Sequence, residues 1–301
     1  MGRGTRSYRQ YERRLGASMV APALIVIALV AAYPIGYAIW LSLNQYSVRT
    51  PGLSRWVGLD NYIDAVTSSE FWSDTFTTVA FTAISVSLEL VIGLGMALAM
   101  HAAFKGRGLL RTVVLVPWAV LTVVSAITWR TLFEPNLGLA PVILSKFGIG
   151  EDILWLGQEG YAMAVMVLAD VWKTAPFMAL LLLAGLQVIP DDVYDAAKVD
   201  GATTWQRFRR ITIPLLMPAI LVALIFRTLD ALRIFDLPYV LTKGSNGTTT
   251  LSLIAHQELT QNRLIGYGSA LSVLTFVIVM AVSFLYIRTV GGNIKSLAEE
   301  G

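Results

Sequence analysis

The sequence PDDVYDAAKVDGATTWQRFRRITIP, residues 190–214, separates two long apolar stretches and predicts how the chain around it is organised. One apolar stretch covers residues 161–189 before it, and another covers residues 211–232 at its end. Apolar runs of about 20 residues are long enough to cross a bilayer as helices. The quoted segment is therefore predicted to be a loop that joins two membrane spans.

Within this loop, the residue types predict two short helices. Asp191 or Asp192 is expected to cap the first helix through its carboxylate. Gly201 provides a turn that ends the first helix. Thr203 and Gln206 have the spacing of a capping box, which predicts the start of the second helix.

The faces of these two helices predict a contact surface. Ala196 and Ala197 make one face of the first helix small, and Trp205 and Phe208 form an apolar ridge on the second. Such a surface suits docking into a groove of another protein. The alternative is an amphipathic connector at the lipid interface whose basic side chains bind headgroups, namely Arg207, Arg209 and Arg210.

Four further apolar stretches complete a set of six predicted spans. They cover residues 17–43, 75–100, 112–129 and 264–287. Only 14% of all residues are charged, against about 25% in soluble domains. Helices satisfy their own backbone hydrogen bonds in lipid. The sequence therefore predicts an all-α polytopic membrane protein with six transmembrane helices.

Basic residues predict the orientation of these spans. Of the 23 Lys and Arg residues, 14 fall in the terminal segments and in the loops on the same side as residues 190–214. Eight, Arg227 and Arg233 among them, are assigned to the opposite side, and Lys173 lies within a span. Because Lys and Arg near span ends tend to stay in the cytoplasm, both termini are predicted to be cytoplasmic.

The composition excludes several classes of function. A net charge of +3 leaves little room for the basic patch that nucleic acid would need. The absence of cysteine excludes disulfide scaffolds, iron–sulfur clusters and cysteine nucleophiles. No G-x-x-x-x-G-K-[ST] phosphate loop occurs, so ATP hydrolysis would have to be done by another polypeptide. We expect no catalytic residue, no metal ligand and no cofactor in this chain.

Charged residues within two predicted spans indicate a functional face, because ionisable groups are costly in a membrane. Each span carries a set spaced at i, i+3, i+4 and i+7, which places the set on one helical face. The first set is Asp170, Lys173, Thr174 and Phe177, and the second is Arg227, Asp230, Ala231 and Ile234. We expect the two faces to line a polar cavity that binds a solute.

A structural interpretation of these charges stays open. Asp170 with Lys173, and Arg227 with Asp230, would then be ion pairs that join helices. Glu89, the single charged residue of the second span, is either a buried polar contact or a cavity residue.

The quoted loop and its flanks resemble a known family. Asp195-Ala196-Ala197, Gly201 and Ile211-x-Ile213-Pro214 are similar to the EAA motif of binding-protein-dependent ABC importer permeases. Two departures are mild: the first Glu of the motif is Asp195 here, and the last Leu is Ile213. Segments similar to the carbohydrate subfamily flank the motif at residues 171–172, 176–177, 184–190, 235–242 and 266–268. The resemblance covers residues 55–290.

The resemblance implies a type I ABC importer permease fold and a division of the chain. A cytoplasmic tail (1–16) and a first transmembrane helix (17–43) precede an outer loop (44–72), a permease core (73–290) with a coupling loop (190–214), and a cytoplasmic tail (291–301). By this resemblance, the coupling residues that contact an ATPase subunit are Asp195, Ala196, Ala197, Gly201, Ile211 and Pro214.

The same resemblance implies partners and a cargo. The partners are a second homologous permease, two copies of a cytoplasmic ATPase that bind ATP and Mg, and an extracytoplasmic solute-binding protein, in a bacterial plasma (inner) membrane. The expected cargo is a sugar, with a disaccharide such as trehalose first, bound at the two intramembrane faces. The alternatives are an ion-coupled secondary carrier or channel, disfavoured by the coupling loop, and an ABC permease for a non-sugar solute.

Overall fold

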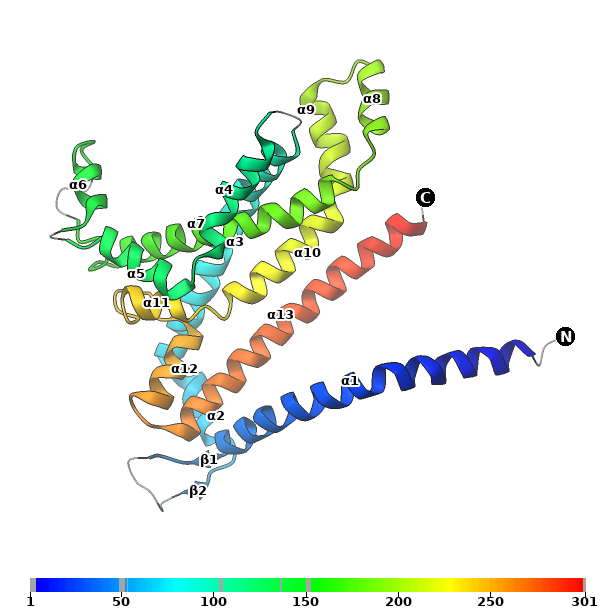
Figure 1. The fold of residues 1–301 in the computed structure, drawn as a ribbon. Coiled ribbons are helices and arrows are strands. Elements are labelled where there is room, and N and C mark those ends of the chain that lie inside the picture. The colour runs from blue at the N-terminus through cyan, green and yellow to red at the C-terminus, as the bar shows by residue number, and fades with distance from the viewer. Residues whose placement is uncertain are drawn as a thin grey trace.

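The chain is described here from a computed structural model. Its backbone is described for residues 4–48, 52, 54–102, 105–135, 137–149 and 153–299, and side chains are described within these ranges for residues 14–286 and for residue 288. This part of the chain is mostly helical (Figure 1). Its two strands, β1 (Asn44–Gln45) and β2 (Arg55–Trp56), form one short antiparallel pair. The predicted all-α fold is confirmed.

Five helices of the described chain are long and apolar enough to cross a membrane, and the number is six if one bent helix pair forms a single span. The spans are α1 (Gly4–Ser42), α3 (Ser69–His101), α4 (Arg107–Ala119) with α5 (Thr122–Leu132), α7 (Tyr161–Leu186), α10 (Ile213–Ala231) with its N-terminal extension, and α13 (Ile265–Glu299). Both chain ends and the loop around α8 (Asp191–Val199) lie on one side of the molecule, opposite α11 (Asp236–Leu241) and α12 (Leu251–Thr260) (Figure 1).

The first and last helices extend beyond the predicted spans. Helix α1 begins at Gly4 rather than at residue 17, and α13 continues to Glu299 rather than ending at residue 287. Apolar length predicts the part of a helix that lies in lipid, whereas good helix formers such as Arg and Gln continue the helix beyond it. Residues 1–3 and 300–301 of the two predicted tails lie outside the described residues.

The third predicted span, residues 112–129, is not one straight helix. Helices α4 and α5 meet at an angle of 88°, and Val120 and Leu121 between them have extended backbone angles. Pro117 lies in the last turn of α4 and cannot donate a backbone hydrogen bond there. Hydropathy detected the apolar length of this segment but carries no signal for the bend.

The core is built where α3, α7 and α10 pack together through small residues. A Cβ added to Gly93 of α3 would lie 2.8 Å from Cγ of Met178 on α7. One added to Gly185 of α7 would overlap with Cβ of Ala219 on α10. Small residues allow helices in a membrane to approach closely. These two glycines therefore fix the distances between the three helices.

The predicted fifth span begins earlier than residue 211. Helix α9 (Thr204–Arg207) leads through one π-helical turn, η1 (Phe208–Thr212), into α10. Pro214 is the second residue of α10. Because a proline ring clashes with the carbonyl four residues before it, the wider π turn at this point accommodates Pro214 within a continuous helix.

Short elements close the end of the molecule opposite α8. They are the strand pair, α2 (Asp60–Thr67), α6 (Leu139–Ser145), α11 and α12. Asn61 of α2 donates hydrogen bonds from Nδ2 to the carbonyls of Ser42 at 2.8 Å and of Asn44 at 3.1 Å. These bonds attach the end of α1 to α2.

Candidate functional site

Arg227 of α10 is the centre of a buried charged cluster. Its side chain is only 2% exposed. Nε donates a hydrogen bond to Oε2 of Glu89 at 2.5 Å, and Nη2 donates one to Oε1 of the same carboxylate at 2.8 Å. Glu89, on α3, is fully buried. Two parallel bonds between a guanidinium and a carboxylate fix the orientation of both groups, so this contact ties α10 to α3.

Helix α7 contributes two more groups to the cluster. Nη2 of Arg227 also donates to Oδ2 of Asp170 at 2.9 Å. The hydroxyl of Thr174 lies 2.7 Å from Oε1 of Glu89 and 2.6 Å from the carbonyl of Asp170. The cluster therefore joins α3, α7 and α10 at one point.

Asp230 connects the cluster to open space. Nη1 of Arg227 donates to Oδ2 of Asp230 at 2.5 Å, and the side chain of Asp230 is 70% exposed. A buried charge without a partner costs several kcal/mol, so the hidden groups need one another. The exposed carboxylate of Asp230, in contrast, is accessible to a ligand.

A cavity of about 180 Å³ opens beside this cluster. Seven of the eight residues predicted for solute binding line it: Asp170, Lys173, Thr174, Arg227, Asp230, Ala231 and Ile234. The eighth, Phe177, is not among the lining residues and stacks on Trp118 of α4, with the ring centroids 5.8 Å apart. The structure thus brings the two predicted helical faces together around one polar cavity.

The predicted ion pairs are partly wrong. Arg227 does pair with Asp230, but Asp170 pairs with Arg227 rather than with Lys173. No carboxylate of the described chain lies within 4.0 Å of the Lys173 ammonium. Spacing along one helix identified residues on a shared face, but the nearest partner of Asp170 comes from the neighbouring helix. Lys173 thus lines the cavity, and its ammonium has no carboxylate partner in the part of the chain that the structure describes.

The sequence did not decide the role of Glu89, and it did not indicate several residues that line the cavity. The signal for Glu89 was its position as the single charge in an apolar stretch, which indicated burial but not its partner. The missed lining residues are Thr122, Arg233, Phe235, Asp236 and Leu237. Most of them follow the end of α10, where the chain turns into α11 and no periodic pattern applies.

The cavity can bind a ligand through hydrogen bonds. Carboxylates at Asp170 and Asp230 accept them, and the ammonium of Lys173 donates them. Alternating acceptors and donors suit the hydroxyl groups of a polyol. Among the described residues, no group of three or more His, Asp or Glu side chains is arranged to hold a metal ion.

The loop over residues 190–214 has the two helices that the sequence predicts. Gly201 has a φ of +76° and ends α8, and Thr203 with Gln206 forms a complete capping box at α9. The predicted cap by Asp191 or Asp192 is wrong, because Pro190 occupies the N-cap position and no side chain caps there. The two carboxylates lie in the first turn instead, where they interact favourably with the helix dipole.

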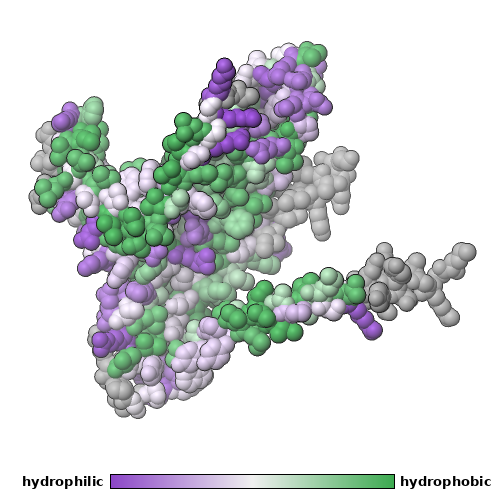
Figure 2. All heavy atoms as spheres, in the orientation of Figure 1, coloured by the Kyte–Doolittle hydropathy of each residue, from purple (hydrophilic) through white to green (hydrophobic). Residues whose placement is uncertain are grey.

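Most of the predicted coupling residues lie on the surface of this loop. Asp195, Ala196, Gly201 and Pro214 are exposed, while Ala197 and Ile211 are partly buried. Hydrophilic side chains gather at the end of the molecule formed by α8 and α9 (Figure 2). The hydroxyls of Tyr194 and Thr212 lie 3.1 Å apart and hold α8 against η1. The small face of α8 is thus presented on an anchored helix.

The second helix of the loop presents both an apolar and a basic surface. Trp205 and Phe208 stack with ring centroids 5.5 Å apart, and Trp205 is exposed, as predicted for an apolar ridge. Arg209 and Arg210 are exposed as well. The geometry is therefore compatible with protein docking and with contact to lipid headgroups.

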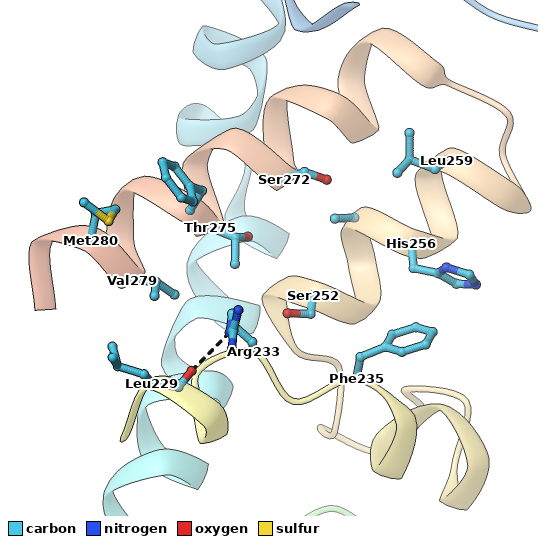
Figure 3. A pocket seen from close by; sticks show the side chains of 12 residues that line it. Leu229, Arg233, Phe235, Ser252, His256, Leu259, Ser272, Thr275, Val279 and Met280 are labelled. Atoms are coloured by element: carbon cyan, nitrogen blue, oxygen red, sulfur yellow. Dashed lines mark hydrogen bonds between the residues drawn. The ribbon is translucent and has the colours of Figure 1, made fainter. Parts of the chain in front are cut away.

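A further cavity of about 560 Å³ lies between the end of α10, α12 and α13 (Figure 3). Apolar side chains such as Val279 and Met280 form much of its wall. Arg233 lines both this cavity and the polar one, and it donates from Nε to the carbonyl of Leu229 at 3.3 Å. None of the predicted solute-binding residues lines the 560 Å³ cavity.

Sequence comparison identifies relatives over nearly the whole chain. The profile of the family described as "binding-protein-dependent transport system inner membrane component" matches residues 89–290. The trehalose transport system permease protein SugA of Mycobacterium tuberculosis is 44% identical, over 94% of this chain and 91% of its own. The trehalose/maltose transport system permease protein MalF of Thermococcus litoralis is 46% identical, over 94% of this chain and 96% of its own.

Structural comparison identifies similar folds. A chain in the crystal structure of a bacterial alginate ABC transporter, in complex with an alginate pentasaccharide-bound periplasmic protein, superposes with a TM-score of 0.78. The two chains are 22% identical, and the match covers 93% of this chain and 96% of that one. Together with the sequence matches, this similarity confirms the predicted type I permease fold.

Proposed function

This chain belongs to the family of binding-protein-dependent transport system inner membrane components and is a permease of an ABC sugar importer; from this premise we propose that it carries a disaccharide such as trehalose across the membrane. The named cargoes of two relatives, trehalose for SugA and trehalose or maltose for MalF, support this class of sugar. A carrier of this kind works by alternating access, in which the cavity is exposed first to one side of the membrane and then to the other.

The observation that carries the proposal is the polar cavity built around Arg227. Its volume of about 180 Å³ is below the roughly 300–1,000 Å³ of typical ligand pockets. A disaccharide site therefore needs a second wall, which a second homologous permease would supply. We assign sugar binding to the seven predicted residues that line the cavity, with hydroxyl contacts to Asp230 and Lys173.

The exposed coupling loop supports the proposal that a separate ATPase subunit hydrolyses ATP for this chain. The chain holds no phosphate loop, and no Gly-Lys dipeptide occurs in it. We therefore assign ATP and Mg binding to two copies of a cytoplasmic ATPase, with α8 and the motif residues from Asp195 to Pro214 in its cleft. A periplasmic solute-binding protein accompanies the similar alginate transporter, and we propose that an extracytoplasmic protein of this kind delivers the sugar here.

The distribution of basic residues supports N and C termini on the cytoplasmic side of a bacterial plasma membrane. Arg227 was counted with the opposite side, but it lies buried within α10 and belongs to neither surface. Removing it from the count increases the bias toward the side of the coupling loop, as the positive-inside rule requires.

Reconstitution of the chain with its partners in liposomes tests this function. We expect ATP-dependent uptake of a labelled disaccharide that requires the ATPase and the binding protein. Asp170→Asn should abolish uptake while the purified complex keeps its composition, whereas Asp74→Asn should leave uptake intact, because Asp74 is a buried carboxylate of α3 that does not line the cavity. Uptake by this chain alone, driven by an ion gradient without ATP, would contradict the proposal.

A further inference from the structure

Carboxylates accept hydrogen bonds from nearly all N–H groups of the Arg227 guanidinium. It has five N–H groups, and four hydrogen bonds from them go to Glu89, Asp170 and Asp230. Three formal negative charges therefore surround one positive charge. An arginine in this state has little capacity left to attract an anion, although one N–H of Nη1 stays available for a neutral hydroxyl.

Glu89 differs from the other two carboxylates in its position. It is fully buried and does not line the cavity, so it has no access to a ligand there. The charged residues that do line the cavity balance one another: Asp170, Asp230 and Asp236 against Lys173, Arg227 and Arg233. Glu89 adds one uncompensated negative charge directly behind this lining. At this depth its field is weakly screened by water.

We propose that Glu89 is a specificity-determining positioning residue, which acts through Arg227 to make the cavity select neutral sugars over anionic ones. It does so in two ways. The bidentate contact turns the guanidinium toward α3, and the negative charge of Glu89 cancels the attraction that Arg227 would exert on a phosphate or carboxylate. The proposal rests on the proposed function, because it concerns the sugar site of that function.

Discrimination of this kind is measured as a ratio of affinities for two ligands. The test uses the membrane complex of the two permeases and two ATPase subunits in lipid nanodiscs. The solute-binding protein is left out, because its own selectivity would otherwise contribute. Equilibrium dialysis compares trehalose with trehalose 6-phosphate, which differ by one charged group. Glu89→Gln keeps the shape of the side chain and removes its charge. We expect the ratio to shift toward the phosphate by about tenfold, which corresponds to about 1.4 kcal/mol.

Four further variants separate a specificity role from a structural one. Glu89→Asp keeps the charge and should keep the wild-type preference. The double variant Glu89→Gln with Arg227→Gln removes both charges and should restore the preference for the neutral sugar. Asp74→Asn removes a buried carboxylate elsewhere on α3 and should leave the ratio unchanged. If Glu89→Gln does not assemble, Asp170→Asn takes a carboxylate from the same guanidinium. Because Asp170 also lines the cavity, both affinities should fall, while their ratio shifts in the same direction.

An unchanged ratio in an assembled Glu89→Gln importer would overturn the proposal. So would a shift that persists in the double variant, because the effect would then not act through Arg227. Failure of the proposed function looks different: the wild-type importer would bind neither trehalose nor maltose, before any variant is compared.

Discussion

Ion pairs in two regions of this molecule have similar distances and opposite surroundings. Arg227 contacts Glu89 and Asp170 at 2.5 to 2.9 Å, with side chains no more than 10% exposed. In the coupling loop, Lys198 contacts Asp195 at 2.6 Å, with side chains 56% and 67% exposed. Distance alone does not distinguish these pairs, whereas burial does.

Burial decides how much each ion pair contributes to the stability of the fold. Removing one partner of a buried pair leaves a charge without a counter-charge or water, and this lowers the free energy of unfolding by about 3–5 kcal/mol. An exposed pair contributes only about 0–1 kcal/mol to it. The cluster around Arg227 thus holds three helices in a fixed arrangement beside the cavity. The charges of the coupling loop contribute little to the fold and stay available to a partner.

Removal of Arg227 should have the largest effect on stability. Arg227→Met leaves Glu89 and Asp170 buried without a counter-charge, so we expect a loss of about 3–5 kcal/mol. This loss of stability is measured as a lower thermal unfolding midpoint of the detergent-purified chain, with size-exclusion chromatography as the readout of the folded fraction. Arg288→Met is the control, because Arg288 is an exposed arginine of α13. Equal midpoints for the two variants would refute the structural importance of the cluster.

Two glycines on α3 test how burial affects stability at positions that carry no charge. Gly93→Ala places a Cβ 2.8 Å from Met178, and we expect overpacking to cost about 1–3 kcal/mol. Gly95→Ala meets nothing within 4 Å, so the unfolding midpoint should stay the same or rise. Destabilisation of the same size in both variants would show that the α3–α7 contact is not as close as described.

The capping box of α9 should give a smaller effect. Thr203→Ala removes the hydroxyl that accepts from the backbone of Gln206, and loss of such a cap costs about 1 kcal/mol. Hydrogen–deuterium exchange over residues 204–208 should rise, with Val199→Ala, which shortens an exposed side chain at the end of α8, as the control. Unchanged exchange would mean that the loop is held by tertiary contacts alone.

The exposed pair should give the smallest effect. Lys198→Ala is expected to change the unfolding free energy of the chain by less than about 1 kcal/mol, with any change weakened further by salt. The same thermal assay at low and high ionic strength measures this. A loss comparable to that of Arg227→Met would remove the distinction between the two regions.

Local signals in the sequence were sufficient for some features of the molecule. The turn at Gly201 and the capping box at Thr203 depend on residues a few positions apart, and both were predicted correctly. Helical spacing likewise placed Asp170 and Arg227 each on the face of its own helix that lines the cavity. These features depend on one helix at a time.

Features that depend on contacts between helices could not be predicted. The partner of Asp170 is 57 residues away and that of Glu89 is 138 residues away, so no periodicity reveals them. Hydropathy does not report the bend after Pro117 or the cap at Pro190, although the proline itself is a local signal for a bend. Contacts with neighbouring helices, rather than residue type, decide the partners of the buried charges.

We assign cargo binding to the Arg227 cluster and ATPase coupling to the small face of α8, and one measurement tests this division directly. Sugar-stimulated ATP hydrolysis is compared in reconstituted importers that carry Ala196→Arg or Lys198→Arg, which place the same side chain about 200° apart around α8. We predict that Ala196→Arg abolishes stimulation, because a bulky side chain blocks docking of the small face, while sugar binding persists and Lys198→Arg is stimulated normally. Full stimulation in Ala196→Arg would contradict the account.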